Sequence, residues 1–195
     1  MRQIAGIISG GQTGADRGGL EAAMELGIPH GGWCPKGRRA EDGAIPRKYR
    51  LKQTRSPSYP ARTERNVLVS DGTVVFTFGP PEAGSALTLK LARKHGKPFL
   101  HVDLAKRSPA ASTERLRAWI DQEGVAILNV AGSRESDAVG MQAMVWRIVK
   151  ASFRDPGSPC SGESGGRFAP RTRRGRGRRT GRPLSASGRG PRGRS

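Results

Sequence analysis

The chain has 195 residues, a net charge of +19, 34% hydrophobic residues and only two cysteines. The distant pair Cys34 and Cys160 excludes a disulfide-stapled scaffold and gives no zinc-binding spacing, which fits a reducing compartment. No apolar run approaches the roughly 18 residues of a membrane-spanning helix. The short apolar stretch that follows Met1 does not read as a signal peptide, so we expect a cytoplasmic protein without a membrane partner.

The positive charge is concentrated at the C-terminal end. Residues 154–195 hold twelve arginines and two acidic residues, a net charge of +10, which leaves +9 for residues 1–153. Apart from Phe168 and Leu184 this segment has almost no large apolar residues, so it cannot bury enough surface to offset the entropy of ordering its backbone. We therefore expect one folded domain at 1–153 and a disordered Arg/Gly-rich tail at 154–195.

The N-terminal part predicts a strand, a glycine-rich turn and a helix. The β-branched run Ile4–Ile8 indicates a buried strand, and the turn Ser9–Gly14 follows it directly. Apolar residues near helical spacing predict a helix at Ala15–Leu26, which Gly27 stops. A second short strand is expected at Ile28–Trp33.

The rest of the chain continues to alternate between strands and helices. Residues 34–60, called the excursion below, are dense in proline, glycine and cations without a period, and we expect them to be ordered. The strongest strand signal is Thr73–Phe78. The other expected elements are helices at Arg62–Val69, Ala86–His95, Thr113–Glu123 and Val139–Phe153, and strands at Pro98–Val102 and Val125–Val130.

This alternation predicts an α/β fold, a Rossmann-like three-layer domain with a mostly parallel sheet. Ligands of such sheets bind outside the carboxyl ends of the strands. Three expected strands end in turns of small residues, namely Ser9–Gly14, Gly79–Ser85 and Ala131–Ser136. Since parallel strands place such turns at one edge, we predict that the three turns surround one ligand.

The first turn has the composition of a phosphate-binding loop. A phosphate needs closely spaced backbone N–H donors that no side chain obstructs, and glycines before a helix provide them. The glycine spacing matches neither Gly-x-Gly-x-x-Gly nor the Walker A motif. The alternative is a tight connection without a ligand. The residues predicted to bind are Ser9, Gly10, Gly11, Gln12, Thr13 and Gly14.

The other two turns add donors at the same edge. Gly84 and Ser85 begin a helix and offer an amide and a hydroxyl, unless the turn is only a rigid proline-shaped loop. Gly132 and Arg134 follow the last strand, and Arg134 can bind an anion bidentately, unless it forms a surface pair with Glu135. We also expect Arg38 of the excursion to neutralise the ligand.

Carboxylates near these turns are the candidates for acid–base chemistry. Asp16 lies in the first turn of the first helix, where capping is the alternative role. Glu41 stands beside Asp42 in the excursion, where a solvated loop is the alternative. The histidines show no ligand spacing, so we predict no directly bound metal. For Trp33 we expect core packing, with stacking on a ligand ring as the alternative.

Four segments, in order along the chain, resemble the putative molybdenum carrier family, which is related to the lysine-decarboxylase-like, Rossmann-type nucleotide-binding proteins. The match runs from about Ile4 to Phe153. It implies a Rossmann-like fold, a homo-oligomer, and binding of molybdenum cofactor or a similar phosphorylated ligand. The segments are Ser9–Leu20, Trp33–Gly43, Arg62–Thr73 and Leu128–Ser136.

Three functional hypotheses follow. The first is a molybdenum carrier-like protein that binds a phosphate-bearing nucleotide or pterin at the three turns. The second is a nucleotide-processing hydrolase, because the wider superfamily includes phosphoribohydrolases; their glycine-rich turn carries a nearby Glu, however, where this chain has Asp16 and Glu21. The third is non-specific nucleic-acid binding through the basic tail.

Overall fold

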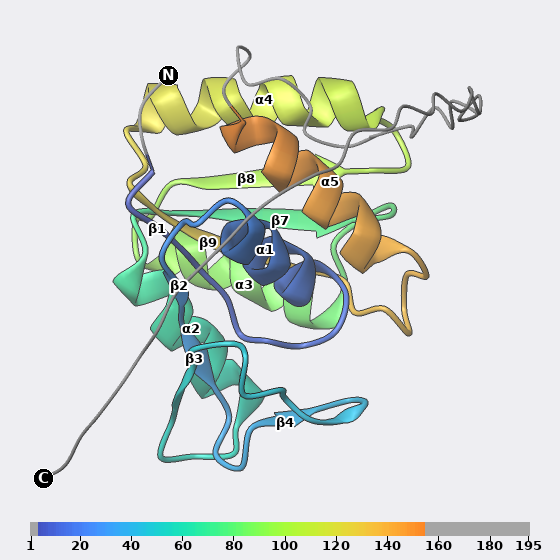
Figure 1. The fold of residues 1–195 in the computed structure, drawn as a ribbon. Coiled ribbons are helices and arrows are strands. Elements are labelled where there is room, and N and C mark those ends of the chain that lie inside the picture. The colour runs from blue at the N-terminus through green and yellow to red at the C-terminus, as the bar shows by residue number, and fades with distance from the viewer. Residues whose placement is uncertain (1–3, 155–195) are drawn as a thin grey trace, which may run out of the picture. The chain divides into compact units, whose positions relative to one another are not determined.

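The computed structural model of the protein describes residues 4–154, which form a parallel five-stranded sheet between two layers of helices (Figure 1). The strand order is β2-β1-β9-β7-β8, and each neighbouring pair is parallel, as the alternation of elements predicts. The strands are β1 (Gly6–Ile8), β2 (His30–Gly31), β7 (Gly72–Thr77), β8 (Phe99–Asp103) and β9 (Ile127–Gly132).

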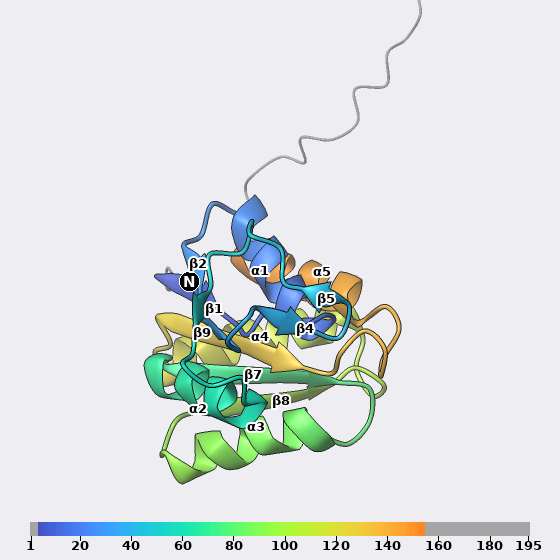
Figure 2. The same ribbon diagram turned by 90° about the horizontal axis from the view of Figure 1, so that it is seen from below.

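Helices cover both faces of this sheet, which confirms the three-layer Rossmann-like architecture. Figure 2, viewed along the sheet, shows α1 and α5 on one side and α2 and α3 on the other. Helix α4 packs against α5 and buries Leu116 and Ile120 in the same core cluster. The helices are α1 (Ala15–Glu25), α2 (Tyr59–Val69), α3 (Ala83–Lys94), α4 (Pro109–Glu123) and α5 (Met141–Phe153).

The last strand in sequence, β9, lies in the middle of the sheet between β1 and β7. Helix α3, which follows β7, and helix α5, which follows β9, lie on opposite faces (Figure 2). The chain therefore leaves two neighbouring parallel strands in opposite directions. A crevice opens at such a point in doubly wound sheets, outside the carboxyl ends of the two strands.

The excursion is ordered, as expected, and contains four short strands. Strand β3 (Trp33–Cys34) pairs in parallel with β6 (Lys52–Gln53), and β4 (Arg39–Ala40) pairs antiparallel with β5 (Gly43–Ala44). These strands enclose a small hydrophobic cluster that also takes in a residue of α1. Its buried members are Leu20, Cys34, Ile45, Tyr49 and Leu51.

The expected strand Ile28–Trp33 is instead split between two sheets, because the chain turns at Gly32. His30–Gly31 pairs with β1, whereas Trp33 pairs with β6. Gly32 has a φ of 122°, and a Cβ there would lie 2.1 Å from the carbonyl oxygen of Ser9. Only glycine can adopt this conformation so close to another backbone segment.

Three helices begin earlier than the apolar spacing predicts. Helices α2 and α4 start at Tyr59 and Pro109 because each has a proline in its first turn, which suits that position. Helix α3 starts at Ala83 because Glu82 and Ser85 form a capping box. The expectation of disorder for the tail concerns residues 155–195, which lie outside the described residues. Within residues 4–154, no helix is long and apolar enough to cross a membrane.

Candidate functional site

The crevice between β7 and β9 holds a cavity of about 510 Å³. Its walls come from the turn after β7, with the first residues of α3, and from the turn after β9. Two of the three small-residue turns therefore meet here. The lining residues include Phe78, Pro80, Gly84, Ser85, Gly132 and Arg134.

A smaller hollow of about 100 Å³ adjoins this cavity and brings in the first turn. Gly84, Gly132 and Arg134 line both spaces, while Gln12 and Asp16 line only the smaller one. Helix α2 contributes Tyr59, Arg62 and Thr63, and α3 contributes Leu87 and Thr88. The three turns thus converge on one crevice, as the parallel sheet predicts.

The glycines of the first turn pack against protein rather than against open space. A Cβ at Gly14 would lie 2.4 Å from the carbonyl oxygen of Ser133, so the first and third turns are in backbone contact. Gly10 lies under the guanidinium of Arg62, and Gly11 faces Leu51. These glycines allow close approach between segments of the chain, and they do not line either space.

The floor of the smaller hollow is a buried ion pair. Arg62 Nη1 lies 3.1 Å from Asp16 Oδ2, and the two side chains are 12% and 6% exposed. The amide of Gln12 also donates to Asp16 Oδ2, at 3.2 Å. Burial raises the pKa of Asp16, although Arg62 and the Gln12 amide lower it in part. The buried Nε of Arg62 has no hydrogen-bond partner among the described residues.

Glu41 joins the excursion to the first and third turns. Its carboxylate accepts hydrogen bonds from the Thr13 hydroxyl, the Ser136 amide at 3.3 Å and the Ser136 hydroxyl at 2.5 Å. Burial acts to raise the pKa of Glu41, but these hydrogen bonds outweigh it and the net pKa is lowered. The ionised carboxylate of Glu41 therefore holds the excursion, the first turn and the third turn together, which is a structural role.

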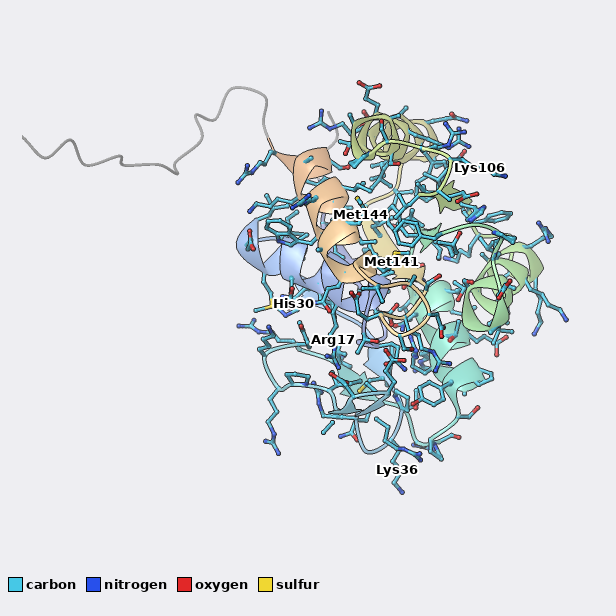
Figure 3. The ribbon with its side chains drawn as sticks, turned by 90° about the vertical axis from the view of Figure 1, so that its right-hand side faces the viewer. Arg17, His30, Lys36, Lys106, Met141 and Met144 are labelled. Atoms are coloured by element: carbon cyan, nitrogen blue, oxygen red, sulfur yellow. The ribbon has the colours of Figure 1, made fainter. Side chains whose placement is uncertain are left out.

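Helix α1 anchors the rest of the excursion. Figure 3 shows Arg17 between α1 and the excursion, where its guanidinium binds both carboxylate oxygens of Asp42 at 2.6 and 2.7 Å. One turn further along α1, Glu21 accepts a hydrogen bond from the hydroxyl of Tyr49 at 2.8 Å. Burial and this bond raise the pKa of Tyr49. Asp42 is therefore tied to an arginine, and the Glu41–Asp42 pair does not face the crevice as two free carboxylates.

Several hydroxyls and carboxylates of the turns have structural partners. The Ser85 hydroxyl belongs to the capping box of α3, and the Ser9 hydroxyl donates to the Val130 carbonyl at 2.6 Å. Glu135 accepts from the amides of Gly140 and Gln142, so it caps α5 and does not pair with Arg134.

Arg134 remains half-exposed at the crevice, with 49% of its side chain accessible. Its ion-pair contacts are long: 3.9 Å from Nη1 to Glu41 and 3.8 Å from Nε to Asp137. The guanidinium therefore keeps donors that can turn toward an anion in the cavity.

The structure divides the residues selected from sequence into three groups. Those lining the crevice are Gln12, Asp16, Gly84, Ser85, Gly132 and Arg134. Those packed between segments are Ser9, Gly10, Gly11, Thr13, Gly14 and Glu41. Arg38 lies elsewhere: its guanidinium donates to the carbonyls of Ile45, Pro46, Tyr49 and Leu51 in the excursion.

Sequence reasoning did not select Tyr59 or Phe78 for the site. Pro60 could have signalled that α2 starts at Tyr59, which would have placed Tyr59 and Arg62 on one helix at the sheet edge. No local signal identifies Phe78, whose half-exposed ring follows a fully buried strand.

The crevice is lined by groups of both charges, because Glu82 and Asp137 border the same cavity as Arg134. The arginine, the start of α3 and the glycine backbone are the parts of its walls that favour negative charge. Among residues 4–154, no group of three or more His, Cys, Asp or Glu side chains is arranged to hold a metal ion.

Comparisons with known proteins agree with this fold. A model of the circularly permutated YpsA SLOG family matches residues 7–153. The strand order fits such a permutation, because counting strands from β7 gives the doubly wound order 2-1-3-4-5. The chain is also similar to a crystal structure named "putative molybdenum carrier protein" from Syntrophus aciditrophicus SB, with 40% identity and a TM-score of 0.76 over 77% of this chain and 96% of that one. The comparison with curated proteins gave no match.

Proposed function

Since the chain belongs to the circularly permutated YpsA SLOG family and is molybdenum carrier-like, we propose that it binds a phosphate-bearing nucleotide or pterin in the crevice between β7 and β9. The observation that carries this proposal is the convergence of three small-residue turns on a crevice that contains Arg134. A cavity of about 510 Å³ has the volume of an ordinary small-molecule site.

The phosphate lies between Arg134 and the start of α3 in this proposal. Helix N-termini attract anions through their free amides and dipole, and α3 presents Gly84 there, where a Cβ would meet no atom within 4 Å. A ligand can therefore approach the backbone closely. Arg134 supplies the charge, and its fork of donors matches two phosphate oxygens.

The ring of the ligand extends toward the smaller hollow. Tyr59 and Leu87 offer an apolar wall there, and Gln12, Thr63 and Thr88 offer polar groups that can fix its orientation. Small-molecule sites commonly combine these two kinds of wall. The crevice offers donors for oxyanions, so a molybdenum cargo enters either as molybdate or as part of such a phosphorylated ligand.

Native mass spectrometry of the protein purified from its own cells tests this proposal directly. We expect a bound phosphorylated small molecule that is lost in Arg134→Gln and retained in Arg147→Gln, an exposed arginine on α5 that lines neither space. Gly84→Leu is a second arm: the position has room for a side chain, so the fold should survive while the cavity is reduced.

A clean apo mass, with no melting shift from any nucleotide or molybdopterin, would refute the proposal. Turnover of a bound nucleotide that disappears in Asp16→Asn would instead move the assignment to a hydrolase. Equal ligand retention in Arg134→Gln and Arg147→Gln would place the ligand outside the crevice.

A further inference from the structure

A second cavity, of about 660 Å³, lies where β3 and β6 of the excursion meet helix α2. It shares no lining residue with the crevice between β7 and β9. Its walls include the ring of Trp33, two hydroxyl residues and two arginines. These are Trp33, Thr54, Ser56, Arg55 and Arg65.

Trp33 is held as a fixed, half-buried wall of this cavity. The buried side chain of Asn66 in α2 accepts from the Trp33 amide at 2.8 Å and donates to the Trp33 carbonyl at 3.0 Å. The guanidinium carbon of Arg65 lies 4.6 Å from the centre of the Trp33 ring, and Nζ of Lys52 lies 5.9 Å from it. The sequence favoured core packing for Trp33, but the ring borders solvent-accessible space.

The cations around Trp33 are not neutralised within the part of the chain that the structure describes. Lys52, Arg55 and Arg65 form no ion pair with a carboxylate of residues 4–154. The two carboxylates of the excursion point to other partners, because Glu41 binds Thr13 and Ser136 while Asp42 binds Arg17. This leaves a concentrated positive charge on the outer surface of the excursion.

The positive charge continues beyond the cavity. Eight cations and two acids give the excursion a net charge of +6, out of +9 for residues 1–153. A neighbouring hollow of about 360 Å³ is lined by Arg47 and Arg50 and shares Gln53 with the Trp33 cavity. Two adjoining basic hollows suit an extended polyanion better than a single small anion.

We propose that the Trp33 cavity binds one nucleotide unit of a single-stranded nucleic acid, with the base extending the Trp33–Arg65 stack and the phosphate on Arg55. Proteins that bind single strands combine a positively charged track with aromatic side chains on which bases stack. Arginine planes serve as stacking surfaces in the same way. The next phosphates reach Arg47 and Arg50. A peptide of Asp and Glu residues would gain the charge contacts but has no aromatic ring to stack on Trp33.

This site is separate from the proposed ligand crevice, and its test uses a different probe. Fluorescence anisotropy of a labelled single-stranded oligodeoxythymidine of about ten nucleotides measures the affinity of the full chain. The basic tail is present in every variant, so its base-independent contribution to binding is the same in all of them. The variants are Trp33→Leu, Trp33→Phe and Arg65→Gln, with Arg147→Gln as the matched control of equal charge loss.

We expect Trp33→Leu to weaken binding of the single strand about tenfold, because loss of one stacked base costs that order of affinity. Trp33→Phe should retain most of the affinity. Arg65→Gln should weaken binding more than Arg147→Gln, since it removes a stacking partner as well as a charge. Binding of heparin, a polyanion without bases, should not distinguish Trp33→Leu from the parent chain.

Equal affinity of the parent chain and a natively folded Trp33→Leu for the oligonucleotide would overturn the proposal. So would equal losses for heparin and oligonucleotide, because charge alone would then explain the binding. Tight binding of poly-glutamate with the same dependence on Trp33 would assign the cavity to an acidic protein partner and refute it. If Trp33→Leu fails to fold, the comparison of Arg65→Gln with Arg147→Gln decides in the same way.

Discussion

The buried pair of Asp16 and Arg62 makes the stability of the protein depend on pH. Burial raises the pKa of Asp16, so its ionisation costs stability as pH rises through that value, and Arg62 offsets the cost. We predict that Arg62→Gln loses about 3–5 kcal/mol of unfolding free energy at neutral pH, as expected when one partner of a buried pair is removed. Urea unfolding measures this loss.

The loss of unfolding free energy in Arg62→Gln should shrink as pH falls, because the unpaired carboxyl of Asp16 then becomes protonated and neutral. The double variant Asp16→Asn with Arg62→Gln is the control and should recover most of the stability at neutral pH. A deficit that is the same at all pH values would show that Arg62 acts by packing over Gly10 rather than by neutralising Asp16.

Contact between the first and third turns gives a second prediction at the scale of one residue. Gly14 has φ 74° and ψ −129°, a conformation that other residues avoid, and a Cβ there would meet the third turn. We expect Gly14→Ala to cost at least about 3 kcal/mol through strain and overpacking. Thermal or urea unfolding would detect this loss readily.

Gly27→Ala is the matched control for Gly14→Ala. Gly27 also has a positive φ, of 67°, but a Cβ there meets no atom within 4 Å. Gly27→Ala should therefore lower the free energy of unfolding only by the conformational penalty of about 1–2 kcal/mol. If the two variants were equally destabilised, the close contact between the turns would carry no energy.

The roles of the residues selected for the site were only partly predictable from the sequence. Gly84 and Arg134 line the crevice as expected, since a turn after a parallel strand needs only local sequence to be recognised. Gly14 instead contacts a turn more than a hundred residues later, and Arg38 binds carbonyls of its own loop. Such long-range or loop-specific contacts leave no periodic signal.

Among the elements, the excursion depends on Glu41 for its attachment to the sheet edge. Hydrogen bonds that lower the pKa of Glu41 stabilise the fold above its ordinary pKa, and this contribution is lost as pH falls through the lowered value. We predict that Glu41→Gln loses about 1–3 kcal/mol at neutral pH, the range for hydrogen bonds to a charged group. Amide hydrogen exchange should accelerate mainly in residues 34–60.

Glu114→Gln, at an exposed position of α4, is the control for Glu41→Gln and should leave both stability and exchange unchanged. The difference between Glu41→Gln and the parent chain should also vanish at strongly acidic pH, where both carry a neutral group. Unchanged exchange in residues 34–60 would mean that Arg17–Asp42 and Tyr49–Glu21 hold the excursion without help.

The strands of the main sheet and the helices that cover it were predictable because their patterns of apolar residues are strong, as in the fully buried strand β7. The interior of the excursion was not, because its strands have two residues each and owe their position to side chains. Asn66 of α2 fixes Trp33, and Arg38 fixes the loop around residues 45–51. Propensity cannot report two-residue strands whose position depends on such side-chain hydrogen bonds.

For the whole molecule, the parallel sheet follows from the sequence but the strand order does not. Alternating strands and helices predict right-handed parallel connections. The insertion of β9 between β1 and β7 depends on contacts between distant segments, such as the pairing of Gly6 with Ile127. The site is consequently predictable as an edge of the sheet, while its location between β7 and β9 requires the structure.

Charge distribution gives the prediction that belongs to the whole molecule. Residues 154–195 carry +10 and the excursion carries +6, so two regions compete for any polyanion. We predict that a chain ending at Phe153 keeps the melting temperature of the full chain, because the family match ends at that residue. Its affinity for heparin should fall, and the slope of log K against log salt should become shallower, because fewer counterions are released.

The same shortened chain separates the tail from the folded domain. Once it is shown to melt like the full chain, its remaining affinity for a single strand should depend on Trp33 more strongly than before, since the base-independent contribution of twelve arginines is gone. Unchanged heparin affinity after truncation would mean that the excursion supplies the polyanion binding alone. A lowered melting temperature would show instead that residues 154–195 contribute to the stability of the domain.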